Sequence, residues 1–99
     1  MNSKNIFITI NHLDDFNGLS NIRVGDSLVL KKDFNNFYDD EAIAVYNDEN
    51  NKIGYVANST CTVARGTASA GRIYDQIEDE INCIVNFILD NQLIAQIKI

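Results

Sequence analysis

No stretch of this sequence approaches the roughly 20 consecutive apolar residues that a membrane-spanning helix requires. Residues 1–5 are not followed by an apolar segment with a small-residue cleavage site, so we expect no signal peptide, a cytoplasmic location and no membrane partner. Proline is absent, while 45% of the residues are hydrophobic and 22% are charged. This composition excludes collagen-like and disordered chains and predicts one globular domain over residues 1–99.

Metal-binding and redox-active side chains are also scarce. The chain has two cysteines, Cys61 and Cys83, and one histidine, His12. A structural zinc site needs about four ligands, so we predict neither a metal nor another cofactor. Cys83 lies in an apolar run and suits packing as a small apolar residue. A disulfide between the two cysteines stays open, although the expected cytoplasmic location disfavours one.

Positive charge is in short supply, because 8 lysines and arginines face 14 aspartates and glutamates, for a net charge of −6. An acidic protein repels polyanions at long range, so any binding of nucleic acid has to rest on short-range contacts. The same acidic surface suits a basic protein partner.

The chain carries apolar segments rich in β-branched residues, separated by short polar turns. These segments predict about six strands, at residues 6–10, 27–32, 42–47, 52–56, 80–89 and 93–99. Residues 48–51 predict a hairpin loop, and residues 90–92 predict a second one. A helix over residues 77–89 is the alternative for the fifth segment. Six strands with short turns favour a small closed or half-closed β-barrel.

Two further segments suggest helix or loop. Residues 57–60 offer an N-cap for a short helix that ends near residue 64, although Thr62 and Val63 are poor helix formers. Residues 65–72 are almost all small and are flanked by Arg65 and Arg72. This run is typical of a surface connection, and its alternative is an anion contact made by backbone N–H groups and the two arginines.

The most distinctive stretch is the polar run 35–41, which leads directly into the strand predicted at 42–47. Loops at the ends of strands often carry function. Tyr38 offers a stacking face and a hydroxyl, and Asp39 offers a carboxylate that accepts hydrogen bonds. The alternative is a solvated loop in which Phe37 or Tyr38 folds back over the core. The residue types alone leave both interpretations open.

The order of motifs resembles the HIRAN domain. Gly25-Asp26 precedes a strand, a Tyr-Asp-x-x-Ala-Ile-x-Val block runs from Tyr38 to Val45, and Ile-Gly-Tyr-Val follows at residues 53–56. The resemblance covers about residues 6 to 99. It implies an all-β (β-rich α+β) fold, namely a small OB-like six-stranded β-barrel with one or two short helices. For members fused to DNA-repair translocases, it also implies binding of the 3′ end of single-stranded DNA.

The resemblance also implies roles for particular residues. Tyr38 and Asp39 match the family's Tyr-Asp pair, in which the aspartate accepts the terminal 3′-hydroxyl and aromatic rings stack on bases. Tyr55 falls where the family places an aromatic residue or histidine after a glycine. Asn58 stands where DNA-binding members carry a basic residue.

The phosphate-binding residues of the family differ here. DNA-binding members carry an arginine-aromatic pair after the first strand, and this chain has Asp14-Asp15-Phe16 instead, so Phe16 keeps only the aromatic ring. The cations that remain as candidates to contact phosphates are Lys52, Arg65 and Arg72.

Two functions therefore fit the sequence. The first is a nucleic-acid-binding module that recognises single-stranded DNA 3′ ends in a DNA repair or processing context. The alternative is a non-catalytic protein-interaction or regulatory module that retains the barrel without the basic DNA clamp. We do not expect an enzyme, because no Ser/His/Asp or Cys/His arrangement has a recognisable spacing. The three consecutive acids 39–41 also point to alternating faces if they lie in a strand, and seldom converge on one ion.

Overall fold

A computed structural model describes the chain over residues 4–12, 22–59 and 61–99. The strands are β1 (Asn5–His12), β2 (Ser27–Lys32), β3 (Ile43–Tyr46), β4 (Lys52–Val56), β5 (Glu80–Ile88) and β6 (Gln92–Lys98). A short helix α1 (Ala70–Ile73) and a 3-10 turn η2 (Tyr74–Gln76) lie between β4 and β5. The predicted all-β small barrel with short helices is confirmed.

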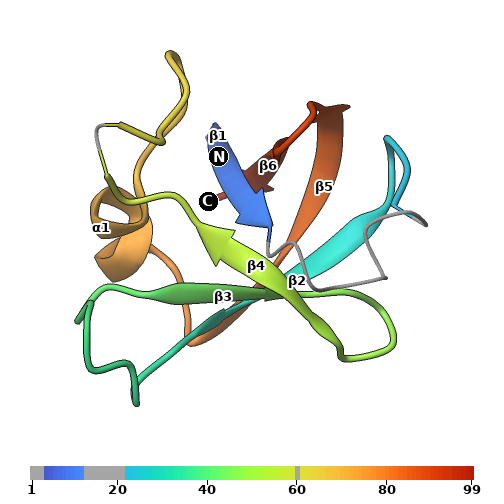
Figure 1. Ribbon diagram of the computed structural model, residues 1–99. Coiled ribbons are helices and arrows are strands. Elements are labelled where there is room, and N and C mark those ends of the chain that lie inside the picture. The colour runs from blue at the N-terminus through green and yellow to red at the C-terminus, as the bar shows by residue number, and fades with distance from the viewer. Residues whose placement is uncertain (1–3, 13–21, 60) are drawn as a thin grey trace.

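The six strands form a closed barrel in the order β1-β4-β3-β2-β5-β6, and every neighbouring pair is antiparallel (Figure 1). The first and last strands close it, in a register that runs from Asn5 opposite Lys98 to Asn11 opposite Gln92. The start of the described chain at Lys4 lies beside Ile99 as a result (Figure 1). The backbone N–H of Lys4 donates to the carbonyl of Ile99 at 2.8 Å.

The core follows from the period-2 alternation of the strands. In β2, Leu28 and Leu30 are buried while Ser27 is exposed, and in β6 Leu93 and Ala95 are buried while Lys98 is exposed. The helix contributes Ala70 and Ile73 to the same apolar cluster. The cluster consists of Ile8, Ile10, Leu28, Leu30, Ile43, Val45, Ile53, Val56, Ala70, Ile73, Ile77, Cys83, Val85, Leu93, Ala95 and Ile97.

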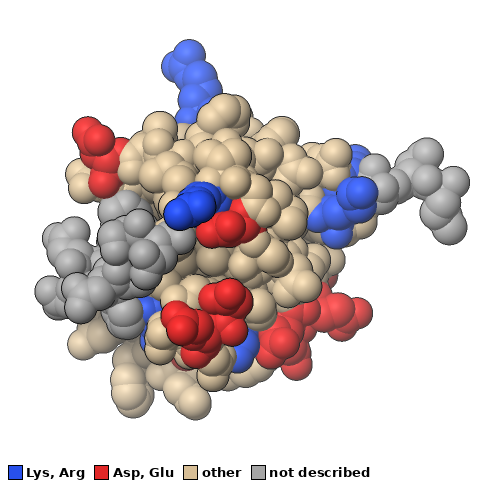
Figure 2. Space-filling view, turned by 90° about the vertical axis from the view of Figure 1, so that its right-hand side faces the viewer, with Lys and Arg blue, Asp and Glu red and all other residues tan. Residues whose placement is uncertain are grey.

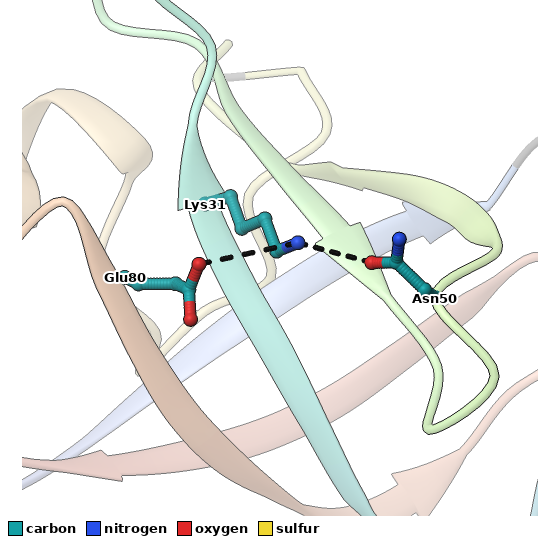
Figure 3. A network of polar contacts seen from close by, with 3 residues as sticks. All are labelled: Lys31, Asn50 and Glu80. Atoms are coloured by element: carbon teal, nitrogen blue, oxygen red, sulfur yellow. Dashed lines mark hydrogen bonds and ion pairs between the residues drawn. The ribbon is translucent and has the colours of Figure 1, made fainter.

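The hairpin predicted at residues 48–51 joins β3 to β4. The side-chain Oδ1 of Asn47 accepts the backbone N–H groups of Glu49 at 3.0 Å and Asn51 at 2.9 Å. Asn50 adopts φ +64°, a conformation that asparagine tolerates better than most residues. Lys31 lies between this hairpin and β5, because its Nζ donates to Asn50 Oδ1 at 3.0 Å and lies 3.9 Å from Glu80 Oε1 (Figure 3).

The helical segments differ from two of the predictions. The helix expected to end near residue 64 is a turn, in which the N–H groups of Thr62 and Val63 both donate to the carbonyl of Ser59. The described helix α1 instead begins inside the small-residue run 65–72. Ser69 caps it by accepting the N–H of Arg72 at 3.2 Å, and Ala70 is fully buried. The alternative helix over 77–89 is wrong, because β5 occupies most of that range and its β-branched residues suit a pleated sheet.

Residues 62–68 form a strap that crosses the outer face of β1. Thr9 of β1 is fully buried beneath it, and its Oγ1 accepts the backbone N–H of Ala64 at 3.0 Å. The hydroxyl of Thr67 donates to the carbonyl of Ala64 at 2.7 Å, so Thr9 donates its own hydroxyl to Thr67 Oγ1 at 2.8 Å. The N–H of Ala68 donates to the carbonyl of Phe7 at 2.8 Å. These bonds fix the strap to the barrel.

The two thiols differ in environment and form no disulfide. Cys61 is exposed, and Cys83 is buried in the core, where burial raises its pKa to about 12. Over residues 4–12, 22–59 and 61–99, no helix is long and apolar enough to cross a bilayer.

Candidate nucleic-acid interface

The loop between β2 and β3, residues 33–42, is held in one conformation by its own polar groups. Asn36 Oδ1 accepts the backbone N–H groups of Tyr38 at 2.9 Å and Asp39 at 3.0 Å. The loop is closed at its base, because the N–H of Asp33 donates to the carbonyl of Ala42 at 2.9 Å. Side-chain acceptance of N–H groups further along the chain is the usual role of asparagine in turns. The backbone that carries the aromatic residues of this loop is therefore ordered by hydrogen bonds.

Those aromatic residues point into solvent. The exposed fraction of the residue is 98% for both Phe37 and Tyr38, and 67% for Phe34. The interpretation in which Phe37 or Tyr38 folds back over the core is therefore wrong. Three exposed rings on one fixed loop form a surface suited to contact with another molecule.

Asp39 is oriented by groups on both sides. Its Oδ1 accepts the backbone N–H of Glu41 at 2.8 Å, and Asn58 Nδ2 donates to its Oδ2 at 3.2 Å. Asn58 is held in turn by the N–H of Gly71, which donates to Asn58 Oδ1 at 2.7 Å. Within the described residues, Oδ2 has no other partner, which leaves it able to accept a further hydrogen bond. Asn58 thus positions the carboxylate without neutralising it.

Tyr55 belongs to a second polar network beneath the loop. Its hydroxyl donates to Asp33 Oδ2 at 3.0 Å and accepts from Lys52 Nζ at 3.0 Å, and Lys52 lies 5.0 Å from the centre of the Tyr55 ring. Burial alone would raise the pKa of Asp33, but hydrogen bonds from Tyr55 and Asn36 and the charge of Lys52 lower it overall. The hydrogen bond to Tyr55 is the main cause that raises the pKa of Lys52. Lys52 therefore positions the hydroxyl of Tyr55, which in turn is bonded to Asp33 of the loop.

These side chains meet at a surface pocket of about 370 Å³. It is lined by Asn11, Asn36, Tyr38, Asp39, Ala42, Tyr55, Val56, Ala57, Asn58, Ser59 and Thr62. Four predicted site residues therefore come together, namely Tyr38, Asp39, Tyr55 and Asn58. Among the residues that the structure describes, no lysine or arginine lines the pocket.

Seven of the eleven lining residues were not predicted from the sequence, among them Asn36, Asn11 and Thr62. Asn36 could have been found, because an asparagine side chain in a turn commonly accepts the backbone N–H two residues further on. Asn11 and Thr62 carry no local signal. Gln92 links them, because its Nε2 donates to Asn11 Oδ1 at 2.9 Å and to the carbonyl of Thr62 at 2.7 Å.

The remaining predicted residues lie elsewhere. Arg65 and Arg72 are exposed and line two other hollows, beside the strap. Phe16 and its neighbours Asp14 and Asp15 lie outside the described residues. On the face that Figure 2 shows, the described basic side chains are separated from one another, and acidic side chains lie at the upper left, at the centre and along the lower part. That face offers no continuous basic stripe among the described residues to attract a polyanion.

Comparisons with known proteins agree with the fold described above. The HIRAN domain profile matches residues 5–85 of the chain. No curated protein matches it significantly. Among solved structures, the chain is similar to a crystal structure described as a protein from Lactobacillus plantarum, with 25% sequence identity and a TM-score of 0.63. That similarity covers 98% of this chain and 96% of the other.

Proposed function

The chain belongs to the HIRAN domain family of nucleic-acid-binding modules, and we propose that it binds the 3′ end of single-stranded DNA in the pocket between Tyr38 and Asn58. One observation supports this proposal above the others. The Asp39 carboxylate is oriented by Asn58 and by the backbone of its own loop, and Oδ2 keeps acceptor capacity towards the pocket.

The carboxylate selects a terminal hydroxyl over a phosphate. A 3′-hydroxyl donates a hydrogen bond to Asp39 Oδ2, and a bond to a charged acceptor is stronger than one between neutral groups. A 3′-phosphate would place negative charge beside the carboxylate and would bring no such hydroxyl. Among the described residues no lysine or arginine lines the pocket, and the ammonium group of Lys52 is already bonded to the hydroxyl of Tyr55.

Tyr38 supplies the contact to the base. Its ring is 98% exposed on a fixed loop, so stacking requires little ordering of the protein. Stacking of a base on an aromatic ring is worth about 1–3 kcal/mol and tolerates any sequence. Tyr55 lines the same pocket, with its hydroxyl bonded to Asp33. The proposal assigns binding and no catalytic step, and a DNA repair or processing context remains part of it.

The test compares oligonucleotides that differ only at the 3′ end. The wild-type protein is expected to bind a short single strand with a 3′-hydroxyl roughly tenfold more tightly than the 3′-phosphate form, as for loss of a charge-assisted hydrogen bond. Asp39→Asn removes the charge at nearly constant shape, so the two affinities are expected to converge. Fluorescence anisotropy at low salt measures both.

Asp40→Asn is the matched control. It removes one negative charge from the neighbouring exposed residue, which does not line the pocket, and is expected to keep the preference for the hydroxyl. Equal affinity of the wild-type protein for both ends, or no detectable binding of either, would contradict the proposal.

A second candidate function rests on the acidic border of the pocket. Asp40 and Glu41 are exposed beside Asp39, and no cation of the described chain lines the site, which suits a basic segment of a protein partner. This function predicts a stable protein complex that survives nuclease treatment. Reversing the charges of Asp40 and Glu41 would dissociate it, and retained binding after that change would exclude this electrostatic mode.

A further inference from the structure

Two adjoining hollows lie along the strap, away from the pocket. One, of about 350 Å³, is lined by Phe7, Ala64, Arg65, Gly66, Thr67, Phe87, Leu89 and Ile94. The other, of about 410 Å³, is lined by Asn5, Ile6, Phe7, Gly66, Thr67, Ala68 and Arg72. Because they share Phe7, Gly66 and Thr67, they form one continuous surface. We call its four prominent side chains, Phe7, Arg65, Arg72 and Phe87, the arginine strip.

The strip stands on a rigid base. Gly66 adopts φ +89° at the turn of the strap, and the N–H of Thr67 donates to the carbonyl of Ala64 at 3.1 Å. Thr9 anchors the strap from below, as described above, and α1 begins directly behind it. Arg65 lies in the turn of the strap and Arg72 lies in α1, so both project from hydrogen-bonded backbone and binding does not have to order it.

The two arginines differ from three of the lysines in what they contact. Lys31, Lys32 and Lys52 lie over the rings of Tyr46, Tyr74 and Tyr55, at 4.7, 4.6 and 5.0 Å from the ring centres. Over the part of the chain that the structure describes, the guanidinium groups of Arg65 and Arg72 make no ion pair and no hydrogen bond. Their charge is available to an anion.

The strip also offers aromatic faces beside those charges. The exposed fraction is 39% for Phe7 and 59% for Phe87. Exposed rings interleaved with arginines are the combination by which proteins bind single strands, through stacking of bases and neutralisation of phosphates. The arginine strip is a cationic and aromatic surface on a chain of net charge −6, and it suits a single-stranded nucleic acid better than a basic ligand.

The arginine strip and the proposed 3′-end pocket share no lining residue, but the strap runs from one to the other. Thr62, at the start of the strap, lines that pocket, and Gln92 holds Thr62 against Asn11. The chain from Thr62 to Arg65 spans at most about 10 Å. We infer that a DNA strand with its 3′ end in the pocket continues in the 5′ direction along the strap and over the arginine strip. This inference rests on the proposed function and extends it to several more nucleotides, as in OB folds that cover about 4–16 nucleotides.

The test measures how affinity depends on oligonucleotide length. Thymidine oligonucleotides of three and nine residues, each with a 3′-hydroxyl, are titrated into the intact chain. The wild-type protein is expected to bind the longer one roughly tenfold more tightly. Arg65→Gln and Arg72→Gln are each expected to remove much of that gain, and to lower the slope of log affinity against log salt by about 0.7, as for one lost phosphate contact on a single strand.

Arg23→Gln is the matched control, because it removes the same charge from an exposed turn before β2. In Arg23→Gln, the gain in affinity from the three-residue to the nine-residue oligonucleotide is expected to stay within about twofold of the wild-type gain. Binding of the three-residue oligonucleotide is expected to stay unchanged in Arg65→Gln and Arg72→Gln, which also shows that these variants fold.

The outcomes separate the inference from the function beneath it. If the wild-type protein distinguishes 3′-hydroxyl from 3′-phosphate but gains nothing from length, the arginine strip is overturned and the pocket stands. The strip is also overturned if Arg65→Gln and Arg23→Gln behave alike. If the length gain depends on Arg65 and Arg72 while the 3′ end makes no difference, the strip binds single strands and the pocket proposal fails.

Discussion

Thr9 shows how one residue determines the shape of a distant surface. Within the described chain it is the one buried polar residue, at 0% exposure, and its hydroxyl holds both Ala64 and Thr67. Its partners lie more than fifty residues away, so nothing in the local sequence distinguishes this threonine from its apolar neighbours in β1. The position of Arg65 depends on it.

Replacement of Thr9 by valine keeps the shape and removes the hydroxyl. The N–H of Ala64 then loses its acceptor beneath the strap, which typically costs about 1–3 kcal/mol. We expect the free energy of unfolding, measured with urea, to fall by that amount. Thr62→Val is the control, since that hydroxyl bonds only the carbonyl of Ser59 at an exposed site and its loss is expected to cost under about 0.5 kcal/mol. Equal losses in the two variants would contradict the role of Thr9.

At the scale of elements, the loop 33–42 and the hairpin strand β4 are linked through Asp33. Its carboxylate accepts from Tyr55 and Asn36, and its folded pKa lies below the ordinary value of 3.8. The unfolded chain therefore binds its proton more readily than the folded one. The stability that Asp33 contributes is present above pH 3.8 and is lost as the pH falls through the lower folded pKa.

Asp33→Asn tests this link. The difference in unfolding free energy between the wild-type protein and Asp33→Asn is expected to be largest near neutral pH and to close below pH 3.8. Urea unfolding over a series of pH values measures it. Asp40→Asn, which alters an exposed carboxylate without a hydrogen-bond partner among the described residues, is the control and is expected to leave the unfolding free energy near neutral pH almost unchanged. A difference that does not change with pH in Asp33→Asn would rule out the ionic contribution.

The elements also show what the sequence can predict. The sequence predicts strands such as β2 and β4 at their observed bounds. The alternation of apolar and polar residues and the flanking turn residues determine those bounds, and both signals lie within a few positions of the strand. The helix α1 was missed because its segment is nearly uniform in small residues, and only its packing reveals that Ala70 and Ile73 face the core. Likewise Tyr38, Asp39, Tyr55 and Asn58 could be proposed from motifs, whereas the contact of Gln92 with Thr62 and Asn11 could not, since it joins distant segments.

At the scale of the whole molecule, the pairing of β1 with β6 brings Asn5 opposite Lys98, close to both ends of the sequence. A circular permutant that joins residues 99 and 1 through a short glycine-serine linker and opens between Asn50 and Asn51 is expected to fold, because the break falls in an exposed hairpin. Circular dichroism and a thermal unfolding midpoint within several degrees of the wild-type value would show this. A permutant opened inside β2, between Leu30 and Lys31, is expected not to fold. Failure of the first, or folding of the second, would contradict the description of the barrel.

The same closure has a consequence for synthesis on the ribosome. Translation proceeds at about 5–20 residues per second, so β1 emerges several seconds before the strand that completes it. During that interval one edge of β1 and one edge of β5 lack their partner, and exposed edges are sites of pairing with other chains. The nascent barrel is therefore most vulnerable to misassembly until β6 leaves the exit tunnel, and a stall within the β5–β6 hairpin would lengthen that exposure.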